Sequence, residues 1–283
     1  MEIKSLKHTN NNNLFEAFED AFRDYEMQLR KSELLSMLKR RGFNPELSFG
    51  AFYNEKLVAF TFNGIGEYNG AHTAYDTGTG TTKAYRGKGL AQKIFSYSIP
   101  FLKQAGVHQY LLEVLQHNEE AVHLYTKMGF KTVGEFNYYV MEQNAIEFKN
   151  RELPNEYQLR QNADLSNLNT NDFWDFQPSW QNTFGSVKRS AEDFMFFGVY
   201  KKDELLGYSI LDPNSGDLTQ LAVKKSFRRK GIGSYLFQKT LEHNQQDEAK
   251  VININSDCGS LIGFMASHNI QETGKQFEMI KKF

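Results

Sequence analysis

The chain has 283 residues and a formal net charge of −1 at pH 7; 40% of its residues are hydrophobic and 14% are aromatic. This composition is typical of a soluble globular protein, and the near balance of acidic and basic residues argues against a nucleic-acid partner. The single cysteine, Cys258, excludes an internal disulfide and fits a reducing compartment. No apolar stretch reaches the roughly 18 residues that span a bilayer, so we expect a cytoplasmic protein without membrane contact.

The sequence of the first half predicts a series of strands and helices. Aromatic residues from Phe15 to Tyr25 recur at helical spacing after a run of asparagines that offers N-caps. The expected elements, in chain order, are a strand at 2–7, helices at 14–25 and 32–41, a hairpin at 49–60, a strand at 75–83, a helix at 90–104, a strand at 110–114 and a helix at 118–128.

The second half repeats this plan. Residues 49–60 can be laid over 197–208 without a gap, at an offset of 197 − 49 = 148 residues. Further on, the glycine cassettes described next lie at an offset of 231 − 89 = 142 residues, so the first copy has six more residues, which we place in a loop at 63–72. The remaining expected elements are strands at 157–160, 218–223 and 251–255 and helices at 232–244 and 259–267.

A short basic, glycine-spaced cassette occurs once in each half. It reads Arg86-Gly87-Lys88-Gly89-Leu90-Ala91 in the first copy and Arg228-Arg229-Lys230-Gly231-Ile232-Gly233 in the second. Each cassette follows a predicted strand and opens a predicted helix, where unpaired backbone N–H groups and the helix dipole favour an anion. Glycine lets the backbone approach that anion closely. The pattern predicts a phosphate-bearing ligand such as a pyrophosphate.

Together with a second motif, the first cassette resembles the GNAT superfamily of acetyl-CoA-dependent N-acetyltransferases. That motif, Asn-x-x-Ala-x-x-Leu-Tyr-x-Lys-x-Gly-Phe, is complete from Asn118 to Phe130. The second half carries only the cassette, with Met265 where the motif has its tyrosine. The resemblance implies two tandem GNAT-like domains of α/β (α+β) class, each a mixed, splayed, mostly antiparallel sheet flanked by helices. We expect them at residues 1–145 and 157–283, joined by a linker at 146–156.

The resemblance also implies roles for residues of the first half. Tyr125 matches the proton donor to the leaving CoA thiolate, because a phenol is a plausible acid for a thiolate of pKa ~8.5. Glu113 resembles the base of ribosomal-protein alanine acetyltransferases, and Asp76 is its rival. The residues expected at the cofactor are Thr81, Lys83, Arg86, Gly87, Lys88, Gly89, Leu90, Ala91, Asn118, Ala121 and Tyr125.

Several of these positions have a second interpretation. Asn118 could be a plain N-cap, the basic side chains of the cassette could be solvated, and Tyr125 could pack in the core like any aromatic residue of a helix. In the second half, the residues of a possible CoA site are Ala222, Val223, Arg228, Arg229, Lys230, Gly231, Ile232 and Gly233. That half lacks the motif tyrosine, so it either binds CoA without turnover or uses another acid such as Tyr208.

The function implied is transfer of an acetyl group from acetyl-CoA, as co-substrate, to a primary amine of a small molecule or a peptide N-terminus. The alternative is a non-catalytic acyl-CoA sensor or interaction scaffold. Tyrosines such as Tyr68, Tyr75, Tyr138 and Tyr139 could line the acceptor pocket. The seven histidines show no metal-ligand spacing, so we expect no metal. We expect no nucleic-acid or membrane partner, and a monomer or homodimer.

Overall fold

The computed structural model describes residues 1–25, 28–148 and 152–283, and these residues form two compact units. Unit 1 comprises residues 1–134, 184–190 and 277–283, and unit 2 comprises residues 135–183 and 191–276. Residues 149–151 of the expected linker lie outside the described residues. The units are therefore interleaved along the chain, whereas the domains expected at 1–145 and 157–283 follow one another; those boundaries stay a prediction.

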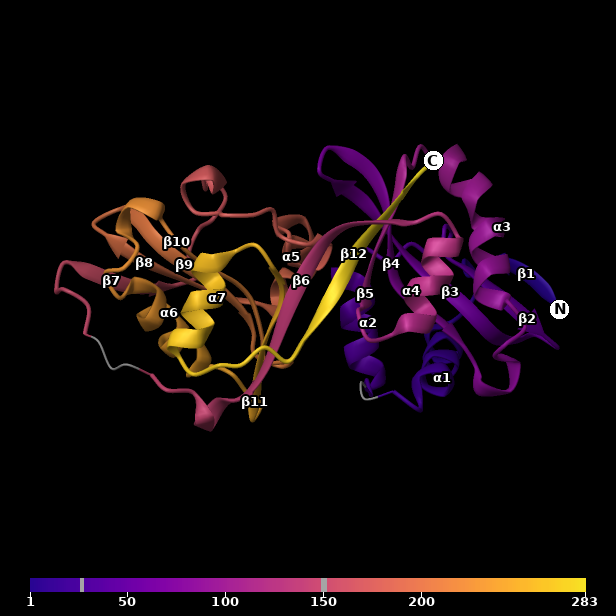
Figure 1. The fold of residues 1–283 in the computed structure, drawn as a ribbon, viewed down its shortest axis with the longest axis horizontal. Coiled ribbons are helices and arrows are strands. Elements are labelled where there is room, and N and C mark those ends of the chain that lie inside the picture. The colour runs from indigo at the N-terminus through magenta and orange to yellow at the C-terminus, as the bar shows by residue number, and fades with distance from the viewer. Residues whose placement is uncertain (26–27, 149–151) are drawn as a thin grey trace. The chain divides into compact units, whose positions relative to one another are not determined.

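Unit 1 is built on a sheet with the strand order β1-β2-β3-β4-β5-β12. Helices α1 and α2 cover one face, where Phe18 and Leu38 pack against Phe60 and Phe62, and α3 covers the other face through Leu90. The elements are β1 (Glu2–Ser5), α1 (Asn11–Phe22), α2 (Lys31–Arg40), β2 (Phe49–Tyr53), β3 (Lys56–Tyr68), β4 (Ala71–Thr81), α3 (Leu90–Gln104), β5 (Gln109–Leu115), α4 (Glu119–Lys127), α5 (Phe184–Arg189) and β12 (Gly274–Lys282) (Figure 1).

Local sequence explains the ends of these helices. Asn10 caps α1 by accepting a hydrogen bond from the Asn13 N–H at 2.9 Å, as the asparagine run predicts. Gly42, with φ +78°, follows α2 in the left-handed region that ends helices. The expected helix at 90–104 is confirmed residue for residue in α3.

The loop expected at 63–72 is wrong. Strand β3 continues to Tyr68 and β4 begins at Ala71, so the two form one long hairpin that turns at Asn69 and Gly70, both with positive φ. The six additional residues of the first copy therefore lengthen a pair of strands. Threonines, aromatic residues and cross-strand pairing stabilise strands even where glycine and asparagine are interspersed, which the sequence pattern underestimates.

Unit 2 has the strand order β6-β11-β10-β9-β8-β7. Helix α6 packs through Ile232 and Leu236 against Phe197 and Val199, and α7 places Met265 in the neighbouring core cluster. The elements are β6 (Lys131–Glu142), β7 (Tyr157–Gln161), β8 (Met195–Lys201), β9 (Glu204–Asp212), β10 (Asp217–Val223), α6 (Ile232–Leu241), β11 (Glu248–Asn255) and α7 (Gly259–Ser267) (Figure 1).

The two halves repeat in register as well as in order. A β-bulge interrupts the β3–β4 pairing at Thr77, and an equivalent bulge interrupts the β9–β10 pairing at Thr219, 142 residues later. The β2–β3 and β8–β9 hairpins also share a bulge, at positions 148 residues apart. Asp76 and Leu218 therefore occupy equivalent positions, each immediately before its bulge.

Each sheet opens between its parallel strands. Strands β4 and β5 are paired only from Thr73 to Tyr75, although β4 continues to Thr81, and β10 and β11 are paired only at Asp217. Beyond these pairs the strands part. Two tandem domains, each with a splayed and mostly antiparallel sheet, are confirmed.

Each half also receives a strand from outside its own stretch of sequence. Strand β6 follows the first copy but pairs with β11 of unit 2 from Phe136 to Glu142. Strand β12 follows the second copy, yet its residues from Phe277 onward belong to unit 1, where β12 is the neighbour of β5. In Figure 1 the end of the yellow strand β12 lies among the purple and magenta elements of unit 1, near the label C.

Candidate functional site

The two glycine turns have nearly the same conformation. Gly89 (φ +68°) caps α3 and Gly231 (φ +88°) caps α6, both in the left-handed region. A Cβ built on Gly87 or Gly89 would meet no atom within 4 Å, so the space in front of the first turn is open. The first N–H groups of each helix have no intrahelical partner. The turns therefore fit a pyrophosphate group, as the cassettes predict.

The arginine that opens each cassette is held by protein groups. In unit 1, the Arg86 guanidinium donates to the Asp24 carboxylate at 3.0 Å and to the Ala21 carbonyl at 2.9 Å, both near the end of α1. Its Nε donates to the carbonyl of Thr81, the last residue of β4, at 3.4 Å. The hydrogen bond from Arg86, followed by one from Lys83, lowers the pKa of the Asp24 carboxyl. Arg86 therefore ties the end of α1 to the end of β4.

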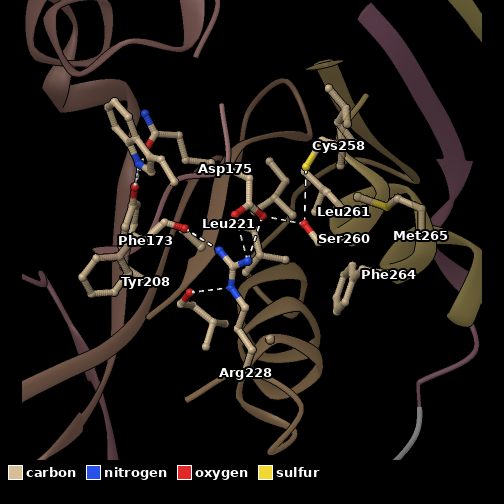
Figure 2. Close-up of a pocket in the computed structure, with 18 of the residues that line it drawn as sticks. Phe173, Asp175, Tyr208, Leu221, Arg228, Cys258, Ser260, Leu261, Phe264 and Met265 are labelled. Carbon is tan, nitrogen blue, oxygen red and sulfur yellow. Dashed lines mark hydrogen bonds and ion pairs between the residues drawn. The ribbon is translucent and has the colours of Figure 1, made fainter. Parts of the chain in front are cut away.

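The equivalent arginine of unit 2 makes the same three kinds of contact. Arg228 donates to both Asp175 carboxylate oxygens at 2.8 and 2.9 Å, to the Phe173 carbonyl at 2.7 Å and, through Nε, to the Val223 carbonyl at 3.2 Å. The Ser260 hydroxyl, in the first turn of α7, donates to Asp175 at 2.6 Å (Figure 2). Sequence reasoning missed Asp24 and Asp175, because nothing in the local pattern marks an acidic residue that pairs with an arginine more than 50 positions away.

The other residues expected at the first turn have mixed environments. The Lys83 ammonium lies 3.3 Å from Asp24, and the Lys88 ammonium lies 4.6 Å from the centre of the Tyr85 ring. Leu90 is buried in the core between α3 and the sheet, and Ala91 is half-buried. The side chains of both lysines are exposed.

The structure brings Asp76 and Tyr125 together where β4 and β5 part. The Tyr125 hydroxyl, on α4, donates to the Asp76 carboxylate at 3.2 Å, and Asp76 also accepts from the Thr79 hydroxyl at 2.8 Å and the Gly78 N–H at 2.9 Å. Burial raises the pKa of Asp76, and these three hydrogen bonds counteract part of that shift. Burial and the charge of Asp76 raise the pKa of Tyr125 well above its usual range, so its hydroxyl stays protonated at neutral pH.

Glu113 lies apart from this pair. Its carboxylate accepts a hydrogen bond from the Tyr75 hydroxyl at 2.9 Å. Because Tyr75 and Asp76 are consecutive on β4, their side chains point to opposite faces of the sheet. The structure therefore places the two candidate bases on different faces, with Asp76 beside Tyr125 and Glu113 beside Tyr75.

Asn118 has the role of an N-cap in this structure. Its side-chain oxygen accepts from the Ala121 N–H at 3.2 Å at the start of α4, and Ala121 packs against the core. At the equivalent position of unit 2, Cys258 precedes α7 without a side-chain capping bond, and it is 7% exposed. Such burial is typical of a cysteine with a structural role.

The tyrosines expected around the acceptor divide between the units. Tyr68 and Tyr75 belong to unit 1, where the Tyr68 hydroxyl donates to Glu278 of β12 at 2.8 Å. Tyr138 and Tyr139 lie on the part of β6 that belongs to unit 2, and Tyr139 is in the core of that unit. The strand exchange thus divides the four tyrosines between the two units, and their role at an acceptor pocket stays a prediction.

A cavity of about 400 Å³ opens in unit 2. Its wall on one side is the second cassette from Arg228 to Ser234 with α7, and on the other side the segment Phe173–Asn182 with Tyr208 (Figure 2). Seven of the eight residues expected at the second site line it: Ala222, Val223, Arg228, Arg229, Gly231, Ile232 and Gly233. The remaining one, Lys230, is exposed, with its ammonium 4.6 Å from the Phe227 ring centre.

Within residues 1–25, 28–148 and 152–283, no group of three or more His, Cys, Asp or Glu side chains is arranged to hold a metal ion. Within the same ranges, no helix combines the length and the apolar character that a membrane span requires.

Comparison with known families gives two matches along the chain. Residues 11–130 match the model of the acetyltransferase (GNAT) family, and residues 173–276 match that of an acetyltransferase (GNAT) domain. Among curated proteins, N-alpha-acetyltransferase MAK3 of Arabidopsis thaliana is 27% identical over 106 residues, which are 37% of this chain and 56% of that protein. N-alpha-acetyltransferase 30 of Schizosaccharomyces pombe is 27% identical over 106 residues, 37% of this chain and 71% of that protein. The chain thus matches little more than half of the length of the Arabidopsis relative.

Solved structures resemble the whole chain in fold. A tandem GNAT protein from the clavulanic acid biosynthesis pathway has a TM-score of 0.71 at 10% identity, covering 99% of this chain and 98% of its own. A GCN5-related N-acetyltransferase from Sphaerobacter thermophilus has a TM-score of 0.69 at 11% identity, covering 99% and 95%. At these identities the likeness concerns the tandem fold.

Proposed function

Because the chain belongs to the GNAT family of acetyltransferases, with two GNAT domains in tandem, we propose that its first half transfers an acetyl group from acetyl-CoA to a primary amine. The attack is direct, in a ternary complex. The observation that carries the proposal is the Tyr125–Asp76 hydrogen bond at the point where β4 and β5 part, in the same half as the open turn at Gly87 and Gly89.

The turn and α3 hold the co-substrate. The backbone N–H groups from Gly87 to Ala91 bind the pyrophosphate, helped by the dipole of α3. Acetyl-CoA supplies an activated carbonyl in its thioester, which lies where β4 has left β5. A backbone N–H of β4 that has no β5 partner there polarises this carbonyl.

Two residues on opposite faces of the sheet handle the protons. Glu113 removes a proton from the acceptor ammonium, directly or through a water molecule, on the face that it shares with Tyr75. Tyr125 protonates the departing thiolate on the face of α4. Asp76 orients the Tyr125 hydroxyl through the 3.2 Å hydrogen bond. This division lets the amine arrive on one face while the thiol leaves on the other.

The acceptor is an amine of a small molecule or a peptide N-terminus. The names of the curated relatives, both N-alpha-acetyltransferases, support peptide N-termini as the first class to test. Acceptors should be screened by the release of free CoA thiol from acetyl-CoA, with amino acids, polyamines and short peptides of different first residues. Acetyl-CoA binding without thiol release for any acceptor would favour the sensor over the enzyme.

Replacement of Tyr125 by Phe tests the acid. Removing the phenol proton should lower kcat by about 10²–10⁴-fold, the usual contribution of general acid catalysis, while calorimetry shows nearly unchanged acetyl-CoA affinity. Tyr97→Phe, at a tyrosine of α3 that is 42% exposed, is the matched control and should keep full activity. Equal turnover of Tyr125→Phe and the wild type would remove Tyr125 from the mechanism.

A further inference from the structure

The second half keeps the features that bind a CoA thioester. It repeats the bulge of the first half, the left-handed glycine before the helix and the contacts of the cassette arginine. Gly233 takes the position of Ala91, and a Cβ there would approach Phe264 at 3.4 Å on the wall of the cavity. The retained backbone turn and the cavity in front of it fit the pyrophosphate and the arm that follows it.

The same half has lost the ionisable groups of the proposed reaction. The bulge register places Leu218 at the position of Asp76, and α7 places Met265 at the position of Tyr125. The place of Glu113 falls at Ile252 when counted from the β4–β5 and β10–β11 pairs, and at Asn253 when counted back from the N-cap of each helix, because a bulge interrupts β11 there. Neither residue is ionisable, so the two carboxylates and the phenol of the first half have no ionisable counterpart at these positions of the second.

The carboxylate and the buried phenol on the described wall of this cavity are both paired with other side chains. Asp175 is paired with Arg228, and Tyr208 accepts from the Trp174 indole at 2.7 Å and donates to the Gln220 side chain at 2.8 Å. Burial raises the pKa of Tyr208 well above its usual range. Among the described lining residues, Asp175 is the one carboxylate, so no second acid side chain is placed to act as a base.

Part of the cavity wall is apolar. Leu218, Leu221 and Met265 on the splayed strands and α7 line it, together with Trp174 and Phe176 (Figure 2 shows Leu221 and Met265). The polar side chains of Asn182, Gln220 and Asn253 also line the cavity. In the first half the equivalent place holds the half-buried, hydrogen-bonded pair of Asp76 and Tyr125. An acyl group longer than acetyl can therefore bury its methylenes in the second half against carbon and sulfur atoms.

We propose that the second half binds a CoA thioester with an apolar acyl chain longer than acetyl and retains it without transferring the acyl group. Each further methylene that packs against the apolar part of the wall should improve the affinity for the CoA thioester roughly three- to fourfold until the space is filled. A hexanoyl chain has four more methylenes than acetyl, so hexanoyl-CoA should bind at least about tenfold more tightly even if half of that gain is lost. The site would report the supply of acyl-CoA rather than consume it.

The test uses the full chain with Gly89→Glu, which blocks the first turn by its carboxylate and its bulk at φ +68°. Calorimetry with CoA, acetyl-CoA and hexanoyl-CoA should show one site that prefers hexanoyl-CoA, and Gly231→Glu, added to this variant, should abolish it. Leu218→Asp should remove the preference for the longer chain while binding of CoA itself changes little. Mass spectrometry should show no mass added to the protein, and no thiol should be released.

Several outcomes would overturn the proposal. These are equal or tighter binding of acetyl-CoA, binding that survives Gly231→Glu, thiol release that depends on Gly231, and an acyl group transferred to Cys258. If Gly89→Glu does not fold, titration of Tyr125→Phe, which keeps both sites, must resolve a second site with the same chain-length preference. The proposed enzymatic function of the first half is tested by a different measurement. It predicts turnover by the wild type that Gly89→Glu abolishes, whereas the present proposal concerns binding in the second half.

Discussion

At the residue scale, consecutive side chains of β4 divide the chemistry of the first half between two faces. The Tyr75 hydroxyl donates a hydrogen bond to Glu113 at 2.9 Å, and Asp76 accepts one from the Tyr125 hydroxyl at 3.2 Å. A carboxylate that already orients the acid is poorly placed to deprotonate an amine on the other face. The two carboxylates, which the sequence left as rivals, can therefore be separated by experiment.

Glu113→Gln and Asp76→Asn should differ in their pH profiles. With Glu113 as the base, Glu113→Gln should lower kcat/KM by about 10²–10⁴-fold and remove the acidic limb of the profile. Asp76→Asn keeps an oxygen that can accept from Tyr125, so it should keep that limb and lose less activity. A lost acidic limb in Asp76→Asn, with a normal limb in Glu113→Gln, would assign the base to Asp76.

Asp76 should also make stability depend on pH. Burial raises its pKa in the folded protein, so folding favours the protonated form. The contribution of Asp76 to the free energy of unfolding is greatest at pH values below its pKa in the unfolded chain, about 3.9. This contribution is lost as the pH rises through the pKa in the folded protein. Asp76→Asn should therefore raise the melting temperature at pH 7 and do so less at pH 5. A lower melting temperature than the wild type at pH 7 would contradict this.

Some of these residues were within reach of the sequence and others were not. Tyr125 and the turn at Gly89 belong to motifs with fixed spacing, which is why they could be placed on the correct elements beforehand. Asp24 and Asp175, the hydrogen-bond partners of Arg86 and Arg228, could not be predicted. They lie 62 and 53 positions away from these arginines, and such a separation leaves no periodic pattern in the sequence. The capping role of Asn118 was foreseen as one of two interpretations, and the structure supplies its hydrogen bond to Ala121.

At the scale of elements, each phosphate-type turn is braced by an arginine that joins three segments. In unit 2 these are the end of β10, the segment at Phe173–Asp175 and, through Ser260, the start of α7. Hydrogen bonds from Ser260 and Arg228 lower the pKa of Asp175, against the opposite effect of its partial burial. The ion pair between Arg228 and Asp175 therefore persists at neutral pH, and this brace keeps the arginine side chain from binding the phosphates of CoA.

A double-mutant cycle should detect this brace in the first half. Arg86→Ala and Asp24→Asn should each weaken acetyl-CoA binding by roughly two- to fivefold, and the double variant should be no weaker than either, because both remove one interaction. Lys88→Ala, whose ammonium lies over the Tyr85 ring, is the control. If Arg86 instead binds phosphate directly, Asp24→Asn should leave affinity unchanged or improve it while Arg86→Ala reduces it.

At the scale of the whole molecule, both sheets depend on a strand that the linear order of the chain assigns elsewhere. Met279 of β12 is 1% exposed and packs in the core cluster that contains Leu112 and Phe130. Neither β12 nor β6 is among the strands that the sequence predicts, and alternation of apolar and polar residues specifies a strand's faces and not the strand it pairs with. For this reason the repeat was foreseen and the exchange was not.

Met279→Ala should destabilise the first half although it lies near residue 283. Loss of a fully buried side chain costs about 2–5 kcal/mol. Hydrogen exchange should show faster exchange of backbone amides in β4 and β5 with little change in β8 and β9. Lys282→Ala, at an exposed position of the same strand, should have no such effect. Faster exchange confined to β8 and β9 would contradict the assignment of β12 to unit 1.

The exchanged strand also affects how the protein is made. On the ribosome, the first copy is complete when Phe130 has been synthesised, but its sheet still lacks the neighbour of β5 until Phe277 and the residues after it emerge. At roughly 5–20 residues per second this wait is on the order of ten seconds, during which one edge of β5 is exposed. The half proposed to carry out the chemistry should therefore be the later of the two to reach its final fold.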